Sequence, residues 1–274
     1  MSVTLPARYS KSVTRLALGV EPLDALRGQR AGARLDVSFD GEPLPMVDVL
    51  RRQRGLPRGA DVLERVPRHH SCRYVVVWRT GIGSPVDLRV DDRTRRFVPR
   101  RLSYVVPADP AVTSPRVRRP AFYPGAAYDV ASGATGLRGR ATWKPSGRPV
   151  RWARVEARRN GARVGVAHGD ERGEFLLLLR PEASTGLTEL PDPPQIEVDV
   201  TVRAAPEGPP ADPGLPARDP LWDLPLEQAP LAGIDLVSPG DVPPPGHTRS
   251  LTREVTFRLG ELRSDMPESE FLLT

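Results

Sequence analysis

The stretch "GVAHGDERGEFLLLL", residues 165 to 179, places one imidazole close to three carboxyl groups. His168 could act as a general base, with Asp170, Glu171 or Glu174 as its partner or as a metal ligand. No HxH, HExxH or CxxC pattern accompanies these residues, and the other histidines lie far away in the sequence. An aspartate that caps a tight turn, followed by a glycine and an apolar strand, explains the same letters. We therefore interpret the stretch as the turn of a β-hairpin.

Two further stretches carry residue types that could do chemistry. The sequence "HHSC" at 69–72 puts a thiol beside two imidazoles, but catalytic Cys–His pairs are usually assembled from separate parts of a chain. The glycine-rich "TGIGSP" at 80–85 is followed by neither a lysine nor a helix, as a phosphate-binding loop requires. No catalytic, cofactor-binding or metal-binding residue is therefore assigned. The chain is predicted not to be an enzyme and to need no cofactor.

The composition favours strands over helices. The 274 residues include 32 prolines and 24 glycines, a density that interrupts helices and limits strand length. Several short segments alternate apolar and polar residues, as half-buried strands do; examples are 33–39, 86–90 and 196–204. The segment 73–78, "RYVVVW", is continuously apolar after its arginine and predicts a buried strand. The sequence therefore predicts an all-β fold of two small antiparallel β-sandwich domains joined by long proline-rich loops.

The domain boundary is expected near residue 120. Prolines punctuate residues 107–120 without any periodicity, which is typical of a linker. Residues 1–120, with this linker at their end, are expected to form an N-terminal sandwich-like domain. Residues 121–274 are expected to form the second domain. Twelve prolines fall between 205 and 247, so this stretch is interpreted as an insertion in the second domain.

The second half carries a family resemblance. Its motifs are Gly139-Arg140-Ala141, then Gly147-Arg148-Pro149-Val150 with Ala153 and Val155, and then Asp170-Glu171-Arg172-Gly173-Glu174-Phe175. Together they resemble the carboxypeptidase regulatory-like domain, a transthyretin-like β-sandwich. The match covers about residues 134 to 180, and "REVTFRLGEL" resembles a returning final strand. The resemblance implies a sandwich fold without catalytic groups. It also departs from the family pattern, because two residues separate Asp170 from Gly173 and no threonine precedes the turn.

The charge of the chain and its N-terminal sequence limit the kinds of partner and the location that can be expected. The net charge is +6, and nearly all of the basic residues are arginine. Local arginine clusters include Arg51-Arg52 and Arg118-Arg119. Interspersed acidic residues and the lack of a recognition motif disfavour nucleic-acid binding. A solvated arginine surface that partly faces an acidic protein partner is the preferred interpretation. The N-terminus has no apolar secretion signal, and no stretch is long enough to span a membrane. A single cysteine, Cys72, excludes an internal disulfide. A cytoplasmic location is expected.

The insertion contains apolar anchors within a proline-rich chain. Leu221, Trp222 and Leu224 in "DPLWDLPLEQAPL" would suit an arm laid across a neighbouring subunit, because a pre-extended chain loses little entropy on docking. A loop that folds back over its own sandwich explains them equally well. The candidate partner-binding residues are therefore Leu221, Trp222, Leu224, Arg51, Arg52, Arg118 and Arg119.

Two classes of function follow. The first is a non-catalytic structural or adaptor protein that binds other subunits of a larger bacterial assembly. A chain of this size with a carboxypeptidase regulatory-like domain resembles accessory proteins of phage-tail-like contractile injection systems, which implies such a role. The alternative is a carbohydrate- or surface-binding β-sandwich module, which would use tryptophans as a platform. An enzyme would require a cleft that brings His168 together with two carboxylates.

Overall fold

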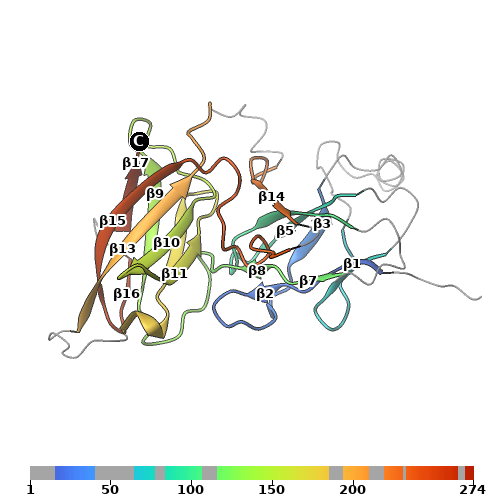
Figure 1. Cartoon of the computed structure of the whole chain (residues 1–274), viewed down its shortest axis with the longest axis horizontal. Coiled ribbons are helices and arrows are strands. Elements are labelled where there is room, and N and C mark those ends of the chain that lie inside the picture. The colour runs from blue at the N-terminus through green and yellow to red at the C-terminus, as the bar shows by residue number, and fades with distance from the viewer. Residues whose placement is uncertain are drawn as a thin grey trace, which may run out of the picture.

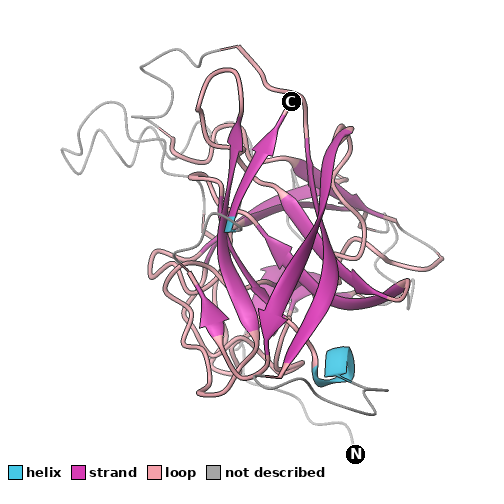
Figure 2. Ribbon diagram, turned by 90° about the vertical axis from the view of Figure 1, so that its left-hand side faces the viewer, coloured by secondary structure: helices cyan, strands magenta, loops and turns pink. Residues whose placement is uncertain are grey.

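The computed structural model describes most of the chain as strands and loops (Figure 2). The described residues are 16–40, 65–77, 84–106, 116–184, 194–209, 219–230, 233–264 and 269–274. The 3-10 turn η1 (Pro181–Ser184) follows one of the strands. The predicted all-β class is confirmed. No helix within these ranges has the length and apolar character needed to cross a membrane.

The described residues of the first half form eight strands, which lie toward the right of Figure 1. These are β1 (Leu16–Val20), β2 (Leu23–Asp24), β3 (Asp36–Phe39), β4 (Tyr74–Val77), β5 (Val86–Asp91), β6 (Arg100–Tyr104), β7 (Val117–Arg118) and β8 (Ala121–Phe122). One sheet has the order β4-β1-β7, and β2 pairs with β8. The strands β6, β5 and β3 form most of another sheet. Its outer strand is β14 (Leu226–Ala229), which comes from the proline-rich segment.

The second half forms two facing sheets. Its other strands are β9 (Gly136–Trp143), β10 (Arg154–Arg159), β11 (Ala162–His168), β12 (Glu174–Leu178), β13 (Gln195–Ala204), β15 (Arg249–Arg258), β16 (Leu262–Arg263) and β17 (Glu270–Leu273). One sheet has the order β11-β10-β13-β15. In the other, β9 lies between β12 and the short strands β16 and β17. The predicted strand at 196–204 is confirmed within one residue of β13.

The sheets are mixed rather than purely antiparallel. Five pairs run parallel: β1 with β7, β2 with β8, β14 with β6, and both β16 and β17 with β9. Each parallel pair joins segments far apart in the sequence, as a crossover connection requires. Only the pairs between close neighbours, such as β10 and β11, use tight antiparallel hairpin turns.

Strand β12 belongs to both hydrophobic cores. Leu176 and Leu178 pack into the core of the first half, and Phe175 and Leu177 pack into the core of the sandwich. This explains the unbroken apolar run "FLLLL", because a strand buried on both faces has no position for a polar residue. The two halves are therefore packed against each other along β12.

One expected strand differs from the structure. The alternation in "PVRWARVEA", residues 149–157, predicts a continuous strand, but β10 begins only at Arg154. Residues 151 and 152 form a turn in which Trp152 has a φ of 59°. The left-handed backbone interrupts the strand and directs the indole toward the proline-rich segment, where its Nε1 donates to Asp223 at 2.8 Å.

Candidate functional site

The turn that follows β11 is held together by Asp170. Its carboxylate accepts hydrogen bonds from the backbone N–H groups of Arg172 at 2.8 Å and Glu174 at 2.9 Å. Gly173 adopts a φ of 74°, which a residue with a Cβ accepts only with strain. The predicted turn is therefore present, and Asp170 caps it as expected. The predicted hairpin is not, because β11 and β12 belong to different sheets and only isolated bridges join them across the turn. Burial raises the pKa of this carboxyl to about 6, against the opposing effect of its backbone hydrogen bonds.

His168 is fully buried, and it lies against the first half of the chain. Its ring stacks on Tyr123, with the ring centroids 3.9 Å apart. Gly240 touches the edge of the ring, and a Cβ there would come within 3.1 Å of Nε2. A hydrogen bond with the backbone of Gly240 raises the pKa of the ring, but by less than burial lowers it. Burial, and then the charges of Arg154 and Arg100, hold the pKa of His168 well below its usual value of 6.5. The imidazole is therefore neutral.

A buried ion cluster joins three parts of the chain beside His168. Glu227 of β14 lies between Arg100 of β6 and Arg154 of β10. Its carboxylate accepts from Arg100 at 2.7 and 3.0 Å and from Arg154 at 2.9 Å. Arg100 also donates to the carbonyl groups of Ala121, Val237 and Ser238. The proline-rich segment is thus fastened to both halves by charge-assisted hydrogen bonds in a dry environment, where such bonds are strong.

Acid is expected to destabilise the protein through His168. The unfolded chain binds a proton at this residue near pH 6.5 and the folded chain does not, so the free energy of unfolding decreases as the pH falls below that value. The slope from one such histidine is at most about 1.4 kcal/mol per pH unit. The lowered pKa of His247, caused mainly by its burial, adds an effect of the same sign. The raised pKa of Asp170 partly opposes it, because that carboxyl gains its proton more readily when folded.

The variant His168→Phe isolates this contribution. Phenylalanine keeps the stacking on Tyr123 and gives up only the contact of the imidazole with the backbone of Gly240. Urea unfolding between pH 7.5 and 5 is expected to show a shallower loss of stability for the variant than for the wild type. Equal slopes would mean that His168 takes up no proton on unfolding.

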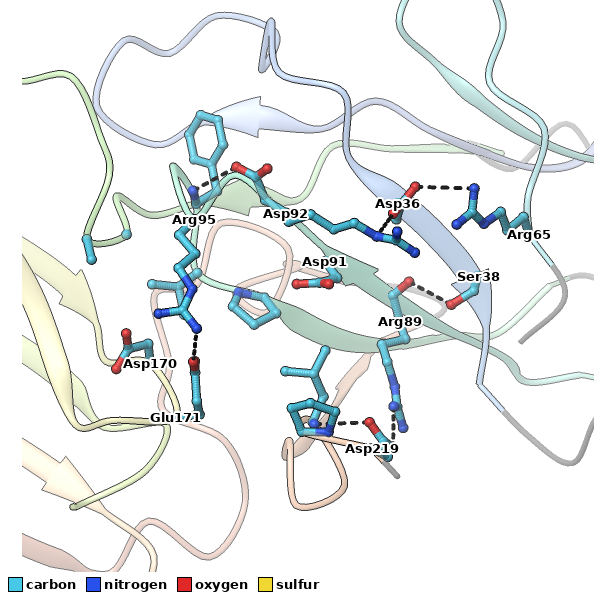
Figure 3. Close-up of a pocket in the computed structure, with 18 residues that line it drawn as sticks. Asp36, Ser38, Arg65, Arg89, Asp91, Asp92, Arg95, Asp170, Glu171 and Asp219 are labelled. Carbon is cyan, nitrogen blue, oxygen red and sulfur yellow. Dashed lines mark hydrogen bonds and ion pairs between the residues drawn. The ribbon is translucent and has the colours of Figure 1, made fainter. Parts of the chain in front are cut away.

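A cleft of about 600 Å³ lies between the first half of the chain and the turn that contains Asp170 and Glu171 (Figure 3). One wall comes from β3 and β5 with the loop after β5, and the opposite wall includes Asp170 and Glu171. Residues 219–221 close a third side. His168 is not among the residues that line the cleft. The structure therefore brings two of the carboxylates that the sequence suggested as candidates into the cleft and seals the imidazole away from it.

The charges of the cleft wall are largely paired with each other. Arg95 bonds to Glu171 at 3.1 Å, and Arg89 bonds to Asp219 at 2.5 Å. Asp36 takes two further arginines of the wall as ion-pair partners. The Asp91 carboxyl lies in the middle of this wall (Figure 3), and burial raises its pKa, with further repulsion from neighbouring carboxylates. The arrangement fixes the two walls to each other across the junction. No group of three or more metal-ligating side chains occurs among the described residues.

A second groove, of about 420 Å³, is lined by three of the four tryptophans. Trp143 and Trp152 are only 6% and 3% exposed, and Trp222 is partly exposed. The charged side chains of the groove are tied to one another: Arg148 pairs with Glu207, and Arg151 pairs with Asp223. The charges in the groove therefore cancel each other. The indoles of Trp143 and Trp152 expose little of their faces to a ligand.

The residues predicted to bind a partner occupy varied environments. Leu221 lines the cleft, Trp222 lines the groove, and Leu224 is 3% exposed. The described part of their segment folds back over its own chain. Arg118 is mostly buried and donates to the carbonyl of Pro230 at 3.2 Å, whereas the side chain of Arg119 is 65% exposed. Arg51 and Arg52 lie outside the described residues. Partner binding by these residues stays a prediction.

A more exposed apolar feature lies at 233–238, and the sequence reading missed it. Ile234 is 83% exposed, the highest value among the large apolar side chains described, and Leu236 is 45% exposed, the same as Leu272. Between them, Asp235 accepts hydrogen bonds from the N–H groups of Val237 and Ser238 and from the Ser238 hydroxyl. Asp235 also pairs with Arg118 at 3.6 Å. The turn is thus braced from within and fastened to β7. Its sequence signal, Gly-Ile-Asp-Leu in a polar loop, is too short to stand out.

Comparison with known proteins adds little to this description. No protein-family model matches the chain, and no curated protein matches it. Among solved structures, the chain is similar to a Streptococcal ancillary pilin, with a TM-score of 0.21 and 10% sequence identity. The likeness covers 66% of this chain and 57% of the pilin chain, so the chain spans less than two thirds of the pilin's length. A likeness of this size does not bear on function.

Proposed function

We propose that the chain is a non-catalytic structural or adaptor protein that binds other subunits of a bacterial multi-protein assembly. The assembly is a phage-tail-like contractile injection system, on the strength of the resemblance of the second half to carboxypeptidase regulatory-like domains. The observation that carries the proposal is the braced turn at 233–238, which presents Ile234 and Leu236 to solvent. Exposed apolar side chains that are grouped, here two on one braced turn, mark protein–protein contact sites more than scattered single ones do.

The bracing matters because ordering a loop at an interface costs free energy. Here Asp235 already holds the turn through three hydrogen bonds within it, and Arg118 fixes the turn to β7. A partner therefore meets a preorganised surface and loses less entropy on binding. Arg119 follows Arg118 on the chain and pairs with the buried Glu21 at 3.6 Å, and its side chain is 65% exposed, so a partner with an acidic rim would still meet its positive charge.

The variant Ile234→Ser tests the contact. Because the side chain is 83% exposed, its replacement should change the free energy of unfolding by no more than about 0.5 kcal/mol. Affinity purification from the native host in gentle salt should recover sheath-, tube- or baseplate-type proteins with the wild type and lose most of them with the variant. The matched control is Leu272→Ser, which removes a leucine that is 45% exposed on β17.

Two outcomes would count against the proposal. Equal recovery of partners by Ile234→Ser and the wild type would remove the turn from the interface. Recovery of no assembly subunit by the wild type, with the protein folded and abundant, would exclude the adaptor role under those conditions.

A carbohydrate- or surface-binding module is the second candidate, and the tryptophan-lined groove is the observation that favours it. Sugars stack on open aromatic faces and exchange hydrogen bonds with free polar groups. In this groove two indoles are nearly covered, and the charged groups are bonded to each other. The adaptor role is therefore preferred. Saturable quenching of tryptophan fluorescence by a soluble glycan, abolished by Trp222→Ala, would reverse that preference.

A further inference from the structure

Three arginines converge on one buried carboxylate at the end of the sheet β4-β1-β7. Glu21 directly follows β1, and its side chain is only 5% exposed. Its carboxylate pairs with Arg30, with Arg73 at 3.1 Å and with Arg119 at 3.6 Å. The arginines come from segments that are far apart in the sequence, so the folded chain assembles this cluster.

The pairing of the strands explains why two of these arginines flank the carboxylate. Val20, the last residue of β1, lies opposite Tyr74 of β4. Because this pair is antiparallel, the next residue along β1, Glu21, lies beside Arg73. On the other side of β1, the parallel register with β7 places Arg119 beside Glu21. The loop after β2 supplies the third arginine.

The cluster carries more positive charge than negative. The hydrogen bond from Arg30 lowers the pKa of Glu21, against the opposite effect of burial, so the carboxylate is ionised. Three guanidinium groups around this one carboxylate leave an excess of two positive charges. Within the described ranges, none of the three arginines pairs with a second carboxylate. By contrast, Arg27 has the carboxylate of Asp24 at 3.9 Å.

The three arginines keep their terminal nitrogens for a ligand. Each contacts Glu21 through its Nε atom, and none uses its Nη groups for a hydrogen bond to the described part of the chain. The side chains of Arg30, Arg73 and Arg119 are 46%, 42% and 65% exposed. A guanidinium group held at Nε still presents two Nη groups, whose planar N–H donors match a carboxylate. The shared carboxylate therefore holds three such donors in place before a ligand arrives.

We propose that Arg30, Arg73 and Arg119 form a binding site for an acidic segment of a protein partner. Two neighbouring carboxylates on that segment would neutralise the excess charge. A long polyanion such as a nucleic acid is disfavoured, because its phosphates would extend past this compact cluster to arginines such as Arg27, which already faces a carboxylate. The proposal rests on the adaptor role proposed above and adds the chemistry of the partner to it.

Fluorescence anisotropy of fluorescein-labelled hexaglutamate, at pH 7.5 and low salt, tests the site. The wild type is expected to bind this peptide and not hexaglutamine. Arg119→Gln and, separately, Arg73→Gln should each weaken binding about fivefold, the upper range for one exposed ion pair. The control Arg158→Gln removes the same charge from a side chain that is 51% exposed and pairs with Glu156 in the second half, and it should leave the affinity unchanged.

Three results would overturn the proposal. The wild type could fail to bind hexaglutamate, or Arg158→Gln could weaken binding as much as Arg119→Gln does, which would mean that net charge alone attracts the peptide. Tighter binding of a hexathymidylate, weakened by the same two variants, would assign the site to nucleic acid. The assay does not involve position 234, so any of these results obtained while Ile234→Ser still loses its partners would remove this site and leave the adaptor role in place.

Discussion

Replacing Glu227 by glutamine is expected to lower the free energy of unfolding by about 3–5 kcal/mol. The substitution preserves the size of the side chain but removes the only carboxylate that faces Arg100 and Arg154 among the described residues. Two buried guanidinium groups would then lack a counter-charge, and the cost of their dehydration would remain. Strand β14 would keep its backbone pairing with β6 but lose the ion pairs that Glu227 makes with both halves, so the proline-rich segment should loosen at the same time.

Urea unfolding followed by tryptophan fluorescence measures this change. The control is Glu171→Gln, which breaks the pair with Arg95 at the cleft, where the Arg95 side chain is 45% exposed. Such solvent-exposed pairs contribute less than about 1 kcal/mol. A loss below about 1 kcal/mol for Glu227→Gln as well would mean that the buried cluster is not what joins the segment to the fold.

Replacing Gly173 by alanine should have the second large effect. The residue has a φ of 74°, and a Cβ there would come within 2.4 Å of the Ala141 carbonyl oxygen. Left-handed strain and the steric clash with β9 together should cost about 2–5 kcal/mol. The clash is with backbone atoms, so no side-chain rotation can relieve it, and the turn must move away from β9.

Gly161→Ala is the matched control. It has a φ of 76°, nearly the same as Gly173, but nothing lies within 4 Å of the added Cβ. It should cost only the left-handed strain, about 1–2 kcal/mol. Thermal or urea unfolding of both variants separates the cost of the left-handed backbone from the cost of the steric clash with β9. Equal losses for the two variants would show that the close approach to β9 has no energetic consequence.

The sequence predicted those features that depend on local alternation and turn chemistry. Strand β13 and the turn capped by Asp170 follow from side-chain periodicity and from the preferences of aspartate and glycine, which act over a few residues. The all-β class follows from the density of proline and glycine. These signals are physical properties of short segments, so they can be read without knowledge of the partner strands.

The features that depend on distant contacts could not be predicted in this way. Strand β14 pairs in parallel with β6, more than a hundred residues earlier, and nothing local in a proline-rich stretch indicates that partner. The burial of Glu227 between two arginines depends on this pairing. The positive φ of Trp152 interrupts an alternation that otherwise predicts a continuous strand. His168 reads as a turn residue, and only the packing of the halves seals it under Tyr123.

Photo-crosslinking from position 234 in the native host tests the proposed adaptor role most directly. A photoreactive amino acid at this exposed position reports what lies against the braced turn inside the cell, and the same residue placed at position 272 serves as the control. The account predicts one dominant crosslink from position 234 to a sheath-, tube- or baseplate-type subunit, and none to that subunit from position 272. Crosslinks absent from position 234, or the same products from both positions, would contradict it.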